Sequence, residues 1–411
     1  MSRLQELIDE LCPDGVEYKR FDEVCSLNAR IGWQRLTKAE HQNSGDFMLV
    51  TGTDFTEVHT INYGTCVYVS QDRYDQDPKI QLKDGDVLIT KDGTLGKVAQ
   101  VRGLPMPATL NGGVFVVRSK DGSLDARFIM YYLLSNHFQN MVDRQKTGST
   151  ISHLTQALFS RLIIPIPPLE VQREIFHILD NFTELTAELT AELTARQKQY
   201  AFYRDQLLSF DDPRKGQTAD LQWKTLGEIG KVSMCKRILK SETNSEQGIP
   251  FYKIGTFGRK ADAYISRELF EEYREKYSYP KKGEILISAA GTIGRTVIYD
   301  GEDAYYQDSN IVWLENDESL VLNRYLYYYY QLQPWYVSTG GTIKRLYNDN
   351  IRNTKIPVPP LSEQERIVAI LDRFDALCND LTSGLPAEIA ARQKQYEYYR
   401  DKLLSFPALE K

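Results

Sequence analysis

Two long segments of the chain carry an apolar stripe with the spacing of a helix–helix interface. In residues 169–210 the stripe advances in alternating steps of three and four residues, and residues 361–406 repeat the same steps. The stripe residues are Ile175, Ile178, Phe182, Leu185, Leu189, Ile367, Ile370, Phe374, Leu377 and Leu381, and the stripes resume at Tyr200, Tyr203, Leu207, Tyr396, Tyr399 and Leu403. Because an unpaired helix of this length would expose a large apolar face, we expect the two stripes to pair in an intramolecular antiparallel coiled coil.

The residues around these segments predict where the helices begin and break. A Pro-Pro pair precedes each segment and cannot continue a helix, and Ser362 with Glu365 has the spacing of a capping box. Gly384 and Pro386 predict a kink or a restart in the second segment. Nothing interrupts residues 170–208, which would form a rod about 58 Å long at about 1.5 Å per residue.

Residues 1–163 and 211–355 have the pattern of one domain present twice. In both, short β-branched runs alternate with Gly- and Asp-rich turns, and a helical stretch follows at 125–140 and at 323–333. The matching motifs are Gly-Thr-Leu-Gly-Lys at 93–97 with Gly-Thr-Ile-Gly-Arg at 291–295, and Thr-Gly-Ser-Thr-Ile at 147–151 with Thr-Gly-Gly-Thr-Ile at 339–343. Between these motifs the copies diverge almost completely, which predicts one architecture reading two different targets.

We therefore predict an α+β fold, in which two mainly β domains related by a pseudo-two-fold duplication are separated by two long helices. The predicted boundaries are 1–163 for the first domain, 164–210 for a central helical spacer, 211–355 for the second domain and 356–411 for a C-terminal helical spacer.

Composition and charge restrict the possible functions. There is no apolar run of about 18 residues and no apolar core of a signal peptide, so we expect a cytoplasmic protein without a membrane partner. A net charge of −6 argues against a free-standing nucleic-acid binder, but it fits a subunit that binds duplex after assembling with other chains. The five scattered cysteines lack a C-x-x-C pair, which favours buried thiols over disulfides or zinc ligands.

No catalytic site and no metal site is predicted. The five histidines show no ligand spacing, and neither a nucleophile motif nor the Asn-Pro-Pro-Tyr type of segment that an adenine methyltransferase needs is found. The Gly-Thr-x-Gly segments lack phosphate-loop spacing. They are either tight strand–strand turns or turns that present Lys97 and Arg295 to DNA. The Thr-Gly-x-Thr-Ile segments either place backbone N–H groups on phosphate or are ordinary helix caps.

Basic and hydroxyl residues in and near these motifs form a candidate DNA-binding set, with solvated surface as the alternative for any one cluster. The set is Lys91, Thr94, Lys97, Arg144, Lys146, Ser149, Lys236, Arg237, Arg259, Lys260, Arg295, Thr342, Lys344 and Arg345.

Together these motifs resemble the specificity subunits of type I restriction–modification systems, over essentially the whole chain. The resemblance includes the Pro-Pro-Leu entries at 167–169 and 359–361 and the Arg-Gln-Lys-Gln-Tyr blocks at 196–200 and 392–396. The tandem Thr-Ala-Glu-Leu repeats at 186–193 are similar to those of the type IC branch. The resemblance implies a non-catalytic DNA reader, in which two target-recognition domains bind the halves of an asymmetric bipartite site.

The same resemblance implies partners and cofactors. The helices would fix the gap between the half-sites and dock two methyltransferase subunits, and restriction subunits would join this complex on double-stranded DNA. S-adenosylmethionine, ATP and magnesium are expected in the partner subunits, and no cofactor is expected on this chain. The alternatives are a specificity chain of a methylation-only or other defence complex, and a coiled-coil interaction scaffold without DNA binding.

Overall fold

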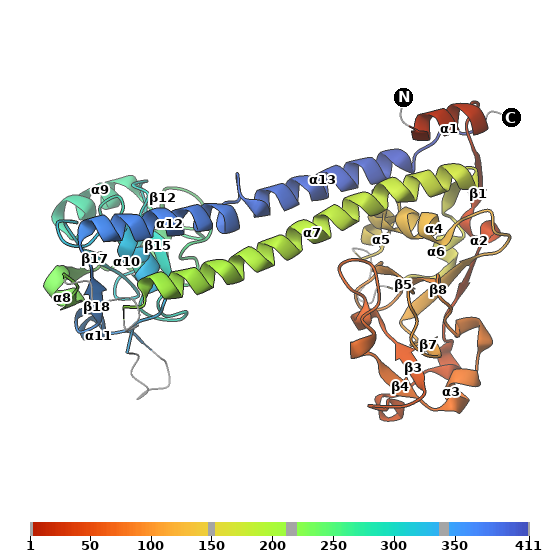
Figure 1. The fold of residues 1–411 in the computed structure, drawn as a ribbon, viewed down its shortest axis with the longest axis horizontal. Helices are drawn as coiled ribbons and strands as arrows, with labels where there is room; N and C mark the ends of the chain where they lie inside the picture. Colours follow the sequence, from red (N-terminus) through yellow and green to blue (C-terminus); the bar gives the residue numbers. More distant parts are fainter. Residues whose placement is uncertain (1–2, 147–152, 211–219, 337–344, 410–411) are drawn as a thin grey trace. The chain divides into compact units, whose positions relative to one another are not determined.

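The computed structural model describes residues 3–146, 153–210, 220–336 and 345–409. The chain forms two compact units: unit 1 is Met1–Glu192 with Ala387–Lys411, and unit 2 is Leu193–Pro386. Each unit contains a mainly β domain together with helical segments from both spacers (Figure 1). The predicted α+β class is confirmed, and a long helix, α7 (Leu169–Leu208), connects the two domains along the chain.

The described strands of unit 1 form three small sheets. Strand order is β2-β8-β5-β6 in an antiparallel sheet and β4-β3-β7 in a mixed sheet, and β1 pairs with β9. The strands are β1 (Glu17–Arg20), β2 (Cys25–Asn28), β3 (Phe47–Val50), β4 (Val67–Val69), β5 (Val87–Thr90), β6 (Val98–Gln100), β7 (Ala108–Leu110), β8 (Val114–Ser119) and β9 (Ile163–Ile166).

Unit 2 repeats this topology strand for strand. The corresponding orders are β11-β17-β14-β15, β13-β12-β16 and β10-β18, and the β12–β16 pair is parallel just as β3–β7 is. The strands are β10 (Gln222–Thr225), β11 (Lys231–Ser233), β12 (Ile249–Tyr252), β13 (Tyr264–Ile265), β14 (Ile285–Ser288), β15 (Thr296–Ile298), β16 (Tyr305–Tyr306), β17 (Ile311–Glu315) and β18 (Lys355–Val358). The predicted duplication is confirmed.

The described helices outside α7 are short in the domains and long in the C-terminal spacer. In unit 1 they are α1 (Arg3–Leu11), α2 (Phe21–Val24), α3 (Gln71–Asp75), α4 (Ala126–Leu134), α5 (Asn136–Lys146) and α6 (Gln156–Phe159), with 3-10 turns at Gly32–Gln34, Lys38–Glu40, Gly52–Asp54, Tyr63–Thr65 and Pro78–Ile80. In unit 2 they are α8 (Leu226–Ile229), α9 (Arg267–Lys276), α10 (Asn323–Tyr330), α11 (Asn348–Arg352) and α12 (Leu361–Asn379), with a 3-10 turn at Lys240–Glu242. Helix α13 (Leu385–Leu403) starts at the end of unit 2 and continues in unit 1.

A central strand in each domain is buried on both faces, which explains its unbroken apolar sequence. In β5, Val87 and Ile89 pack into one core cluster while Leu88 packs into another. Successive side chains of a strand point to opposite faces, so one run of apolar residues contributes side chains to both clusters. Strand β14 does the same with Ile285 and Ile287 on one side and Leu286 on the other.

The uninterrupted helix predicted for residues 170–208 is confirmed, since α7 is 40 residues long. In unit 1 its first part runs antiparallel to α13 (Figure 1), and Phe182 stacks on Tyr399 with ring centroids 5.6 Å apart. In unit 2 its last part lies against α12, where Phe374 stacks on Tyr203 at 5.7 Å. Each unit thus contains one antiparallel helix pair.

These contacts confirm the antiparallel pairing of the two stripes. Because the start of one helix faces the end of the other in an antiparallel pair, the first apolar residues of each stripe pack against the tyrosines at which the other stripe resumes. Ile175 and Ile367 are fully buried, and Ile178, Phe182 and Phe374 pack against the same cores. The stripe then becomes exposed toward its far end: Leu185 is 37% exposed and Leu377 is 38% exposed.

Three further predictions about the second spacer have different outcomes. The predicted restart is confirmed, because α12 ends at Asn379 and α13 begins at Leu385. Leu381 lies in the connection between these helices and is 80% exposed, so its assignment to the seam was wrong. The capping box was also wrong: α12 begins at Leu361, so Ser362 is already inside the first turn.

A buried glutamine attaches each domain to its helix. In unit 1 Gln172 of α7 donates from Nε2 to the carbonyls of Ser123 (2.8 Å) and Pro167 (2.7 Å), and its Oε1 accepts from the Asp125 N–H. In unit 2 Gln364 of α12 makes the equivalent three bonds to the Leu320, Pro359 and Leu322 backbone groups. Both glutamines are fully buried.

An aspartate about two helical turns after each glutamine makes a second matching pair of contacts. Asp180 accepts hydrogen bonds of 2.5 Å from both Arg127 and Tyr131 of α4. Asp372 accepts from Arg324 (2.6 Å) and Tyr328 (2.5 Å) of α10. Each domain is therefore fixed to its helix by the same polar side chains, which the sequence analysis had not identified.

Candidate nucleic-acid interface

The Gly-Thr-x-Gly segment of unit 1 is a tight turn between β5 and β6. Its glycines have positive φ, +71° at Gly93 and +78° at Gly96, which favours glycine because it lacks a side chain. The Thr90 hydroxyl donates to the Thr94 carbonyl and accepts from the Lys97 N–H at 2.9 Å. The hydroxyl of Thr90, the last residue of β5, thus stabilises the turn by bonding to two of its backbone groups.

Unit 2 builds the same turn between β14 and β15. Gly291 and Gly294 have φ of +66° and +76°. The Ser288 hydroxyl donates to the Thr292 carbonyl and accepts from the Arg295 N–H at 2.9 Å. The predicted strand–strand turn is confirmed in both domains, while presentation of Lys97 and Arg295 to DNA stays a prediction.

The cations of the two turns have different surroundings. Lys97 is exposed. Arg295 is half-buried, and its guanidinium donates to the Phe257 carbonyl at 3.0 Å. The loop containing Phe257 continues into Arg259 and Lys260, which are both exposed. Unit 2 therefore gathers three predicted DNA contacts beside one turn, one of which is already engaged with the backbone.

The other predicted DNA contacts are more scattered. Lys236 and Arg237 are exposed after β11, and Arg144 is exposed on α5. Arg345 is half-buried and donates to the Ser309 carbonyl at 2.8 Å. Ser149, Thr342 and Lys344, the two Thr-Gly-x-Thr-Ile segments and the side chain of Lys146 lie outside what the structure describes.

A cavity of about 570 Å³ lies beside the glycine turn of unit 1. It is lined by the segment after β2, by the residues that follow β5, by the turn before β8 and by His153. The polar lining side chains are Arg30, Arg35, Lys38, His41, Lys91, Asp92, Asn111 and His153. Of these, only Lys91 belonged to the predicted set, since the segments lie far apart in sequence.

Arg30 in this cavity has a structural role. It is 4% exposed, and its guanidinium donates to the carbonyls of Leu110 (3.0 Å) and Arg73 (3.3 Å). Burial lowers the pKa of Arg30, and the nearby Arg73 acts in the same direction. Arg35 and Lys38, by contrast, are exposed and face the solvent side of the same segment.

Asp92 is the centre of a polar cluster at the edge of this cavity. One carboxylate oxygen is 2.5 Å from Nδ1 of His153, and the other accepts from Lys91 Nζ at 3.2 Å. Lys91 also lies over the Phe115 ring, 5.7 Å from its centroid, which orients the ammonium group. Burial raises the pKa of Asp92, but the hydrogen bonds from His153 and Lys91 outweigh it and the pKa lies below its ordinary value.

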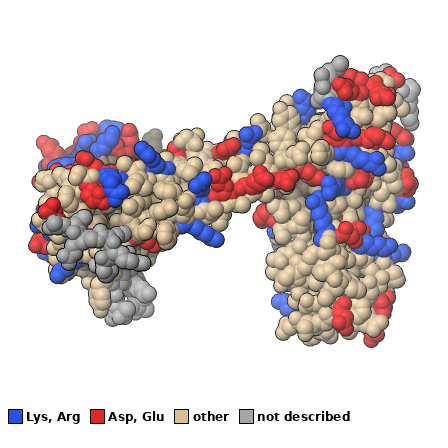
Figure 2. All heavy atoms as spheres, in the orientation of Figure 1, with Lys and Arg blue, Asp and Glu red and all other residues tan. Residues whose placement is uncertain are grey.

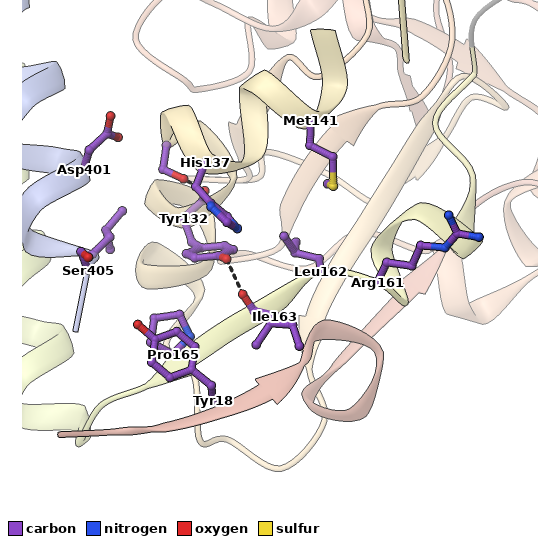
Figure 3. Close-up of a pocket in the computed structure, with 12 residues that line it drawn as sticks. Tyr18, Tyr132, His137, Met141, Arg161, Leu162, Ile163, Pro165, Asp401 and Ser405 are labelled. Atoms are coloured by element: carbon purple, nitrogen blue, oxygen red, sulfur yellow. Dashed lines mark hydrogen bonds between the residues drawn. The ribbon is translucent and has the colours of Figure 1, made fainter. Parts of the chain in front are cut away.

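A second cavity of unit 1, of about 500 Å³, lies at the joint between the domain and the end of α13 (Figure 3). Tyr132 points its hydroxyl at the Ile163 carbonyl, 2.5 Å away, and the Tyr18 hydroxyl donates to the Phe406 carbonyl at 2.7 Å. The Tyr18 bond holds the C-terminal segment on the domain, and the Tyr132 bond joins α4 to β9 within it. We therefore regard this cavity as a structural joint.

The middle of α7 has an acidic surface (Figure 2). Acidic side chains follow the middle of α7 (Figure 2), where Glu184 and Glu188 of the Thr-Ala-Glu-Leu repeats are exposed. Such a row repels phosphate groups.

Other kinds of site find no support in the described part of the chain. It contains no group of three or more His, Cys, Asp or Glu side chains that could hold a metal ion. The five cysteines are buried and free, as predicted. Among the described helices, none has both the length and the apolar character needed to cross a bilayer.

Comparison with known proteins identifies the family. The model of the type I restriction modification DNA specificity domain matches twice, at residues 13–196 and 219–391. A protein of Haemophilus influenzae described as a type I restriction enzyme specificity subunit is 55% identical over 304 residues, which cover 72% of this chain and 76% of that protein. The Escherichia coli EcoR124I/EcoR124II specificity subunit is 36% identical over 319 residues, covering 72% of this chain and 74% of that protein.

Solved structures have the same fold. A chain from a structure of the assembly and conformational transition of a type I R-M system matches with a TM-score of 0.63 and 22% identity, covering 96% of this chain and 98% of that one. The HsdS subunit from Thermoanaerobacter tengcongensis matches with a TM-score of 0.52 and 21% identity, covering 97% and 99%. The chain therefore belongs to the specificity subunits of type I restriction–modification systems, which are non-catalytic subunits.

Proposed function

We propose that this chain reads an asymmetric bipartite DNA site, one half with each domain, and docks two methyltransferase subunits on its helices. One observation carries the DNA-reading part. The two domains share a strand order and a turn, but different side chains occupy equivalent positions beside that turn. Lys91 and Asp92 follow β5 in the first domain, whereas Ala289 and Ala290 follow β14 in the second.

The backbone at these equivalent positions supports this comparison. The Lys91 N–H donates to the Gly113 carbonyl at 2.8 Å, and the Ala289 N–H donates to the Asn310 carbonyl at 2.7 Å. A duplicated frame with different side chains is what two readers of unrelated half-sites require, because base edges are read by side chains while the frame only positions them.

Duplicated exposed aromatic residues support two equivalent docking sites. Phe202 follows the first Arg-Gln-Lys-Gln-Tyr block and is 63% exposed, and Tyr398 follows the second block at the same distance and is 61% exposed. Each contacts the next aromatic residue edge-on, Tyr203 in one case and Tyr399 in the other. Exposed aromatic residues are frequent anchors of protein interfaces. In this proposal S-adenosylmethionine, ATP and magnesium are bound by the partner subunits, and restriction subunits join the same complex.

The test is to reconstitute the full chain with its methyltransferase subunits. Native mass spectrometry should show two methyltransferase chains per specificity chain. Phe202→Ala should weaken the binding of one of these chains, and Tyr398→Ala the binding of the other. The complex should select, from randomised duplex DNA, two specified segments separated by a fixed unspecified gap. A single continuous motif, or selection of no motif, would contradict DNA reading by two domains. A 1:1 complex at saturation would contradict the docking of two partners.

A further inference from the structure

The charge pattern of the cavity beside the glycine turn of unit 1 is not explained by phosphate binding alone. Four of its lining side chains are cationic: Arg30, Arg35, Lys38 and Lys91. Asp92 is the sole carboxylate among the lining residues that the structure describes. Phosphate oxygens are acceptors and carry negative charge, so an ionised carboxylate beside them repels them. Lys91 and His153 already contact this carboxylate, so a ligand that reaches it binds best by bringing a further donor.

The fold does not need this carboxylate. The Lys91 carbonyl accepts from the Leu154 N–H at 3.0 Å, and in unit 2 the Ala289 carbonyl accepts from the Leu346 N–H at 2.8 Å. The second domain thus makes the same backbone bonds with an alanine, Ala290, where the first has Asp92. The Asp92 side chain is therefore available for a role other than building the frame.

The carboxylate is both fixed and reachable. His153 and Lys91 each hold one of its oxygens, and the Asp92 side chain is still 30% exposed. A carboxylate offers about four acceptor positions, so an incoming donor can still be accepted. His41 also lines the cavity, and its Nε2 atom is buried without a hydrogen-bond partner among the described residues. Such an atom fits a site that is completed by a ligand.

Duplex DNA offers donors of one kind at its groove edges, the exocyclic amino groups of cytosine, adenine and guanine. We propose, building on the DNA-reading function proposed above, that Asp92 is a specificity-determining residue that accepts a hydrogen bond from the exocyclic amino group of one base in the half-site of the first domain. Arg35 and Lys38, which are exposed at the same cavity, contact the neighbouring phosphates. The second domain has alanine at this position and lacks this contact.

The test measures base preference at every position of the site with the reconstituted complex. Asp92→Ala should lower the discrimination at one position of one half-site by about 10-fold and leave the other half-site unchanged. Asp92→Asn keeps the size of the side chain but can both donate and accept. It should shift the preference at that same position toward adenine, which an amide can bind through N6 and N7.

Two control variants separate this role from its rivals. Asp46→Asn removes an exposed carboxylate of the same domain that does not line the cavity, and it should leave the motif unchanged. His153→Ala should weaken binding without moving the preferred base, because its ring only helps to hold Asp92.

The outcomes distinguish the inference from the function on which it rests. If the wild-type complex selects no bipartite motif, the proposed function fails. If it selects one and the Asp92 variants weaken all sequences equally, the carboxylate is only structural and the inference fails alone. A shift of preferred base in His153→Ala would assign the reading to the histidine and overturn the role of Asp92.

Discussion

Single buried polar side chains decide how each domain is attached to its helix. Gln172 and Gln364 each satisfy two carbonyls and one N–H, and in each case the bond to a proline carbonyl, of Pro167 or Pro359, is buried. Hydrophobic periodicity could not identify them, because it marks the apolar face of a helix and treats a polar residue as solvent-facing. The same holds for Asp92, which became notable only when the fold brought it beside residues from three other segments.

Replacing either glutamine with leucine should therefore destabilise its own unit. Gln172→Leu removes the partner of three backbone groups, and the Pro167 carbonyl among them is left buried and unpaired. We expect a loss of about 2 kcal/mol in the free energy of unfolding, since one buried unpaired group costs about 1–3 kcal/mol. Gln364→Leu should cost a similar amount in unit 2. Urea unfolding is the measurement, with Gln197→Leu on the exposed side of α7 as the control. Equal stability of all three variants would contradict the role given to the buried amides.

At the scale of elements, the strands and turns were predictable and their surroundings were not. The runs at 86–90 and 284–288 contain β5 and β14, because short runs of β-branched residues bounded by glycine turns strongly favour strands. The Gly-Thr-x-Gly sequence predicted a tight turn in both domains. It did not predict that Arg295 would donate a hydrogen bond to a backbone carbonyl while Lys97 is exposed. That difference comes from the loop around Phe257, which belongs to the divergent part of the second domain.

The two glycines of one turn should differ in their tolerance of a methyl group. Both have positive φ, which costs an alanine about 1–2 kcal/mol. An added Cβ at Gly93 meets nothing within 4 Å, but at Gly96 it would lie 3.0 Å from Val142 Cγ1. We expect Gly96→Ala to lower the melting temperature clearly more than Gly93→Ala in thermal unfolding. Equal effects of the two substitutions would show that α5 does not pack on the turn as the structure has it.

At the scale of the whole molecule, the duplication could be predicted in full and the pairing of helices only in part. Motif order and spacing across both copies predicted a repeated topology, which the strand orders confirm. The two apolar stripes predicted an antiparallel helix pair, and Tyr396 and Tyr200, at which the stripes resume, pack into the cores of units 1 and 2 respectively. The stripes did not predict that Leu185 and Leu377 would be more than a third exposed.

The central claim is that two domains read two half-sites whose separation is fixed by the helices. An extra Thr-Ala-Glu-Leu unit in α7 adds about 6 Å of helix at about 1.5 Å per residue. On DNA this corresponds to about one or two base pairs at about 3.4 Å each. The insertion lies outside both domains, so it should change the gap and leave the half-sites intact.

The most direct test is to map methylated adenines in cells that carry the complete system, with the wild-type chain and with the insertion variant. We predict one bipartite motif for the wild type, and for the variant the same two half-sites with a gap longer by about one or two base pairs. Altered half-site sequences with an unchanged gap, or a motif without two parts, would contradict the claim.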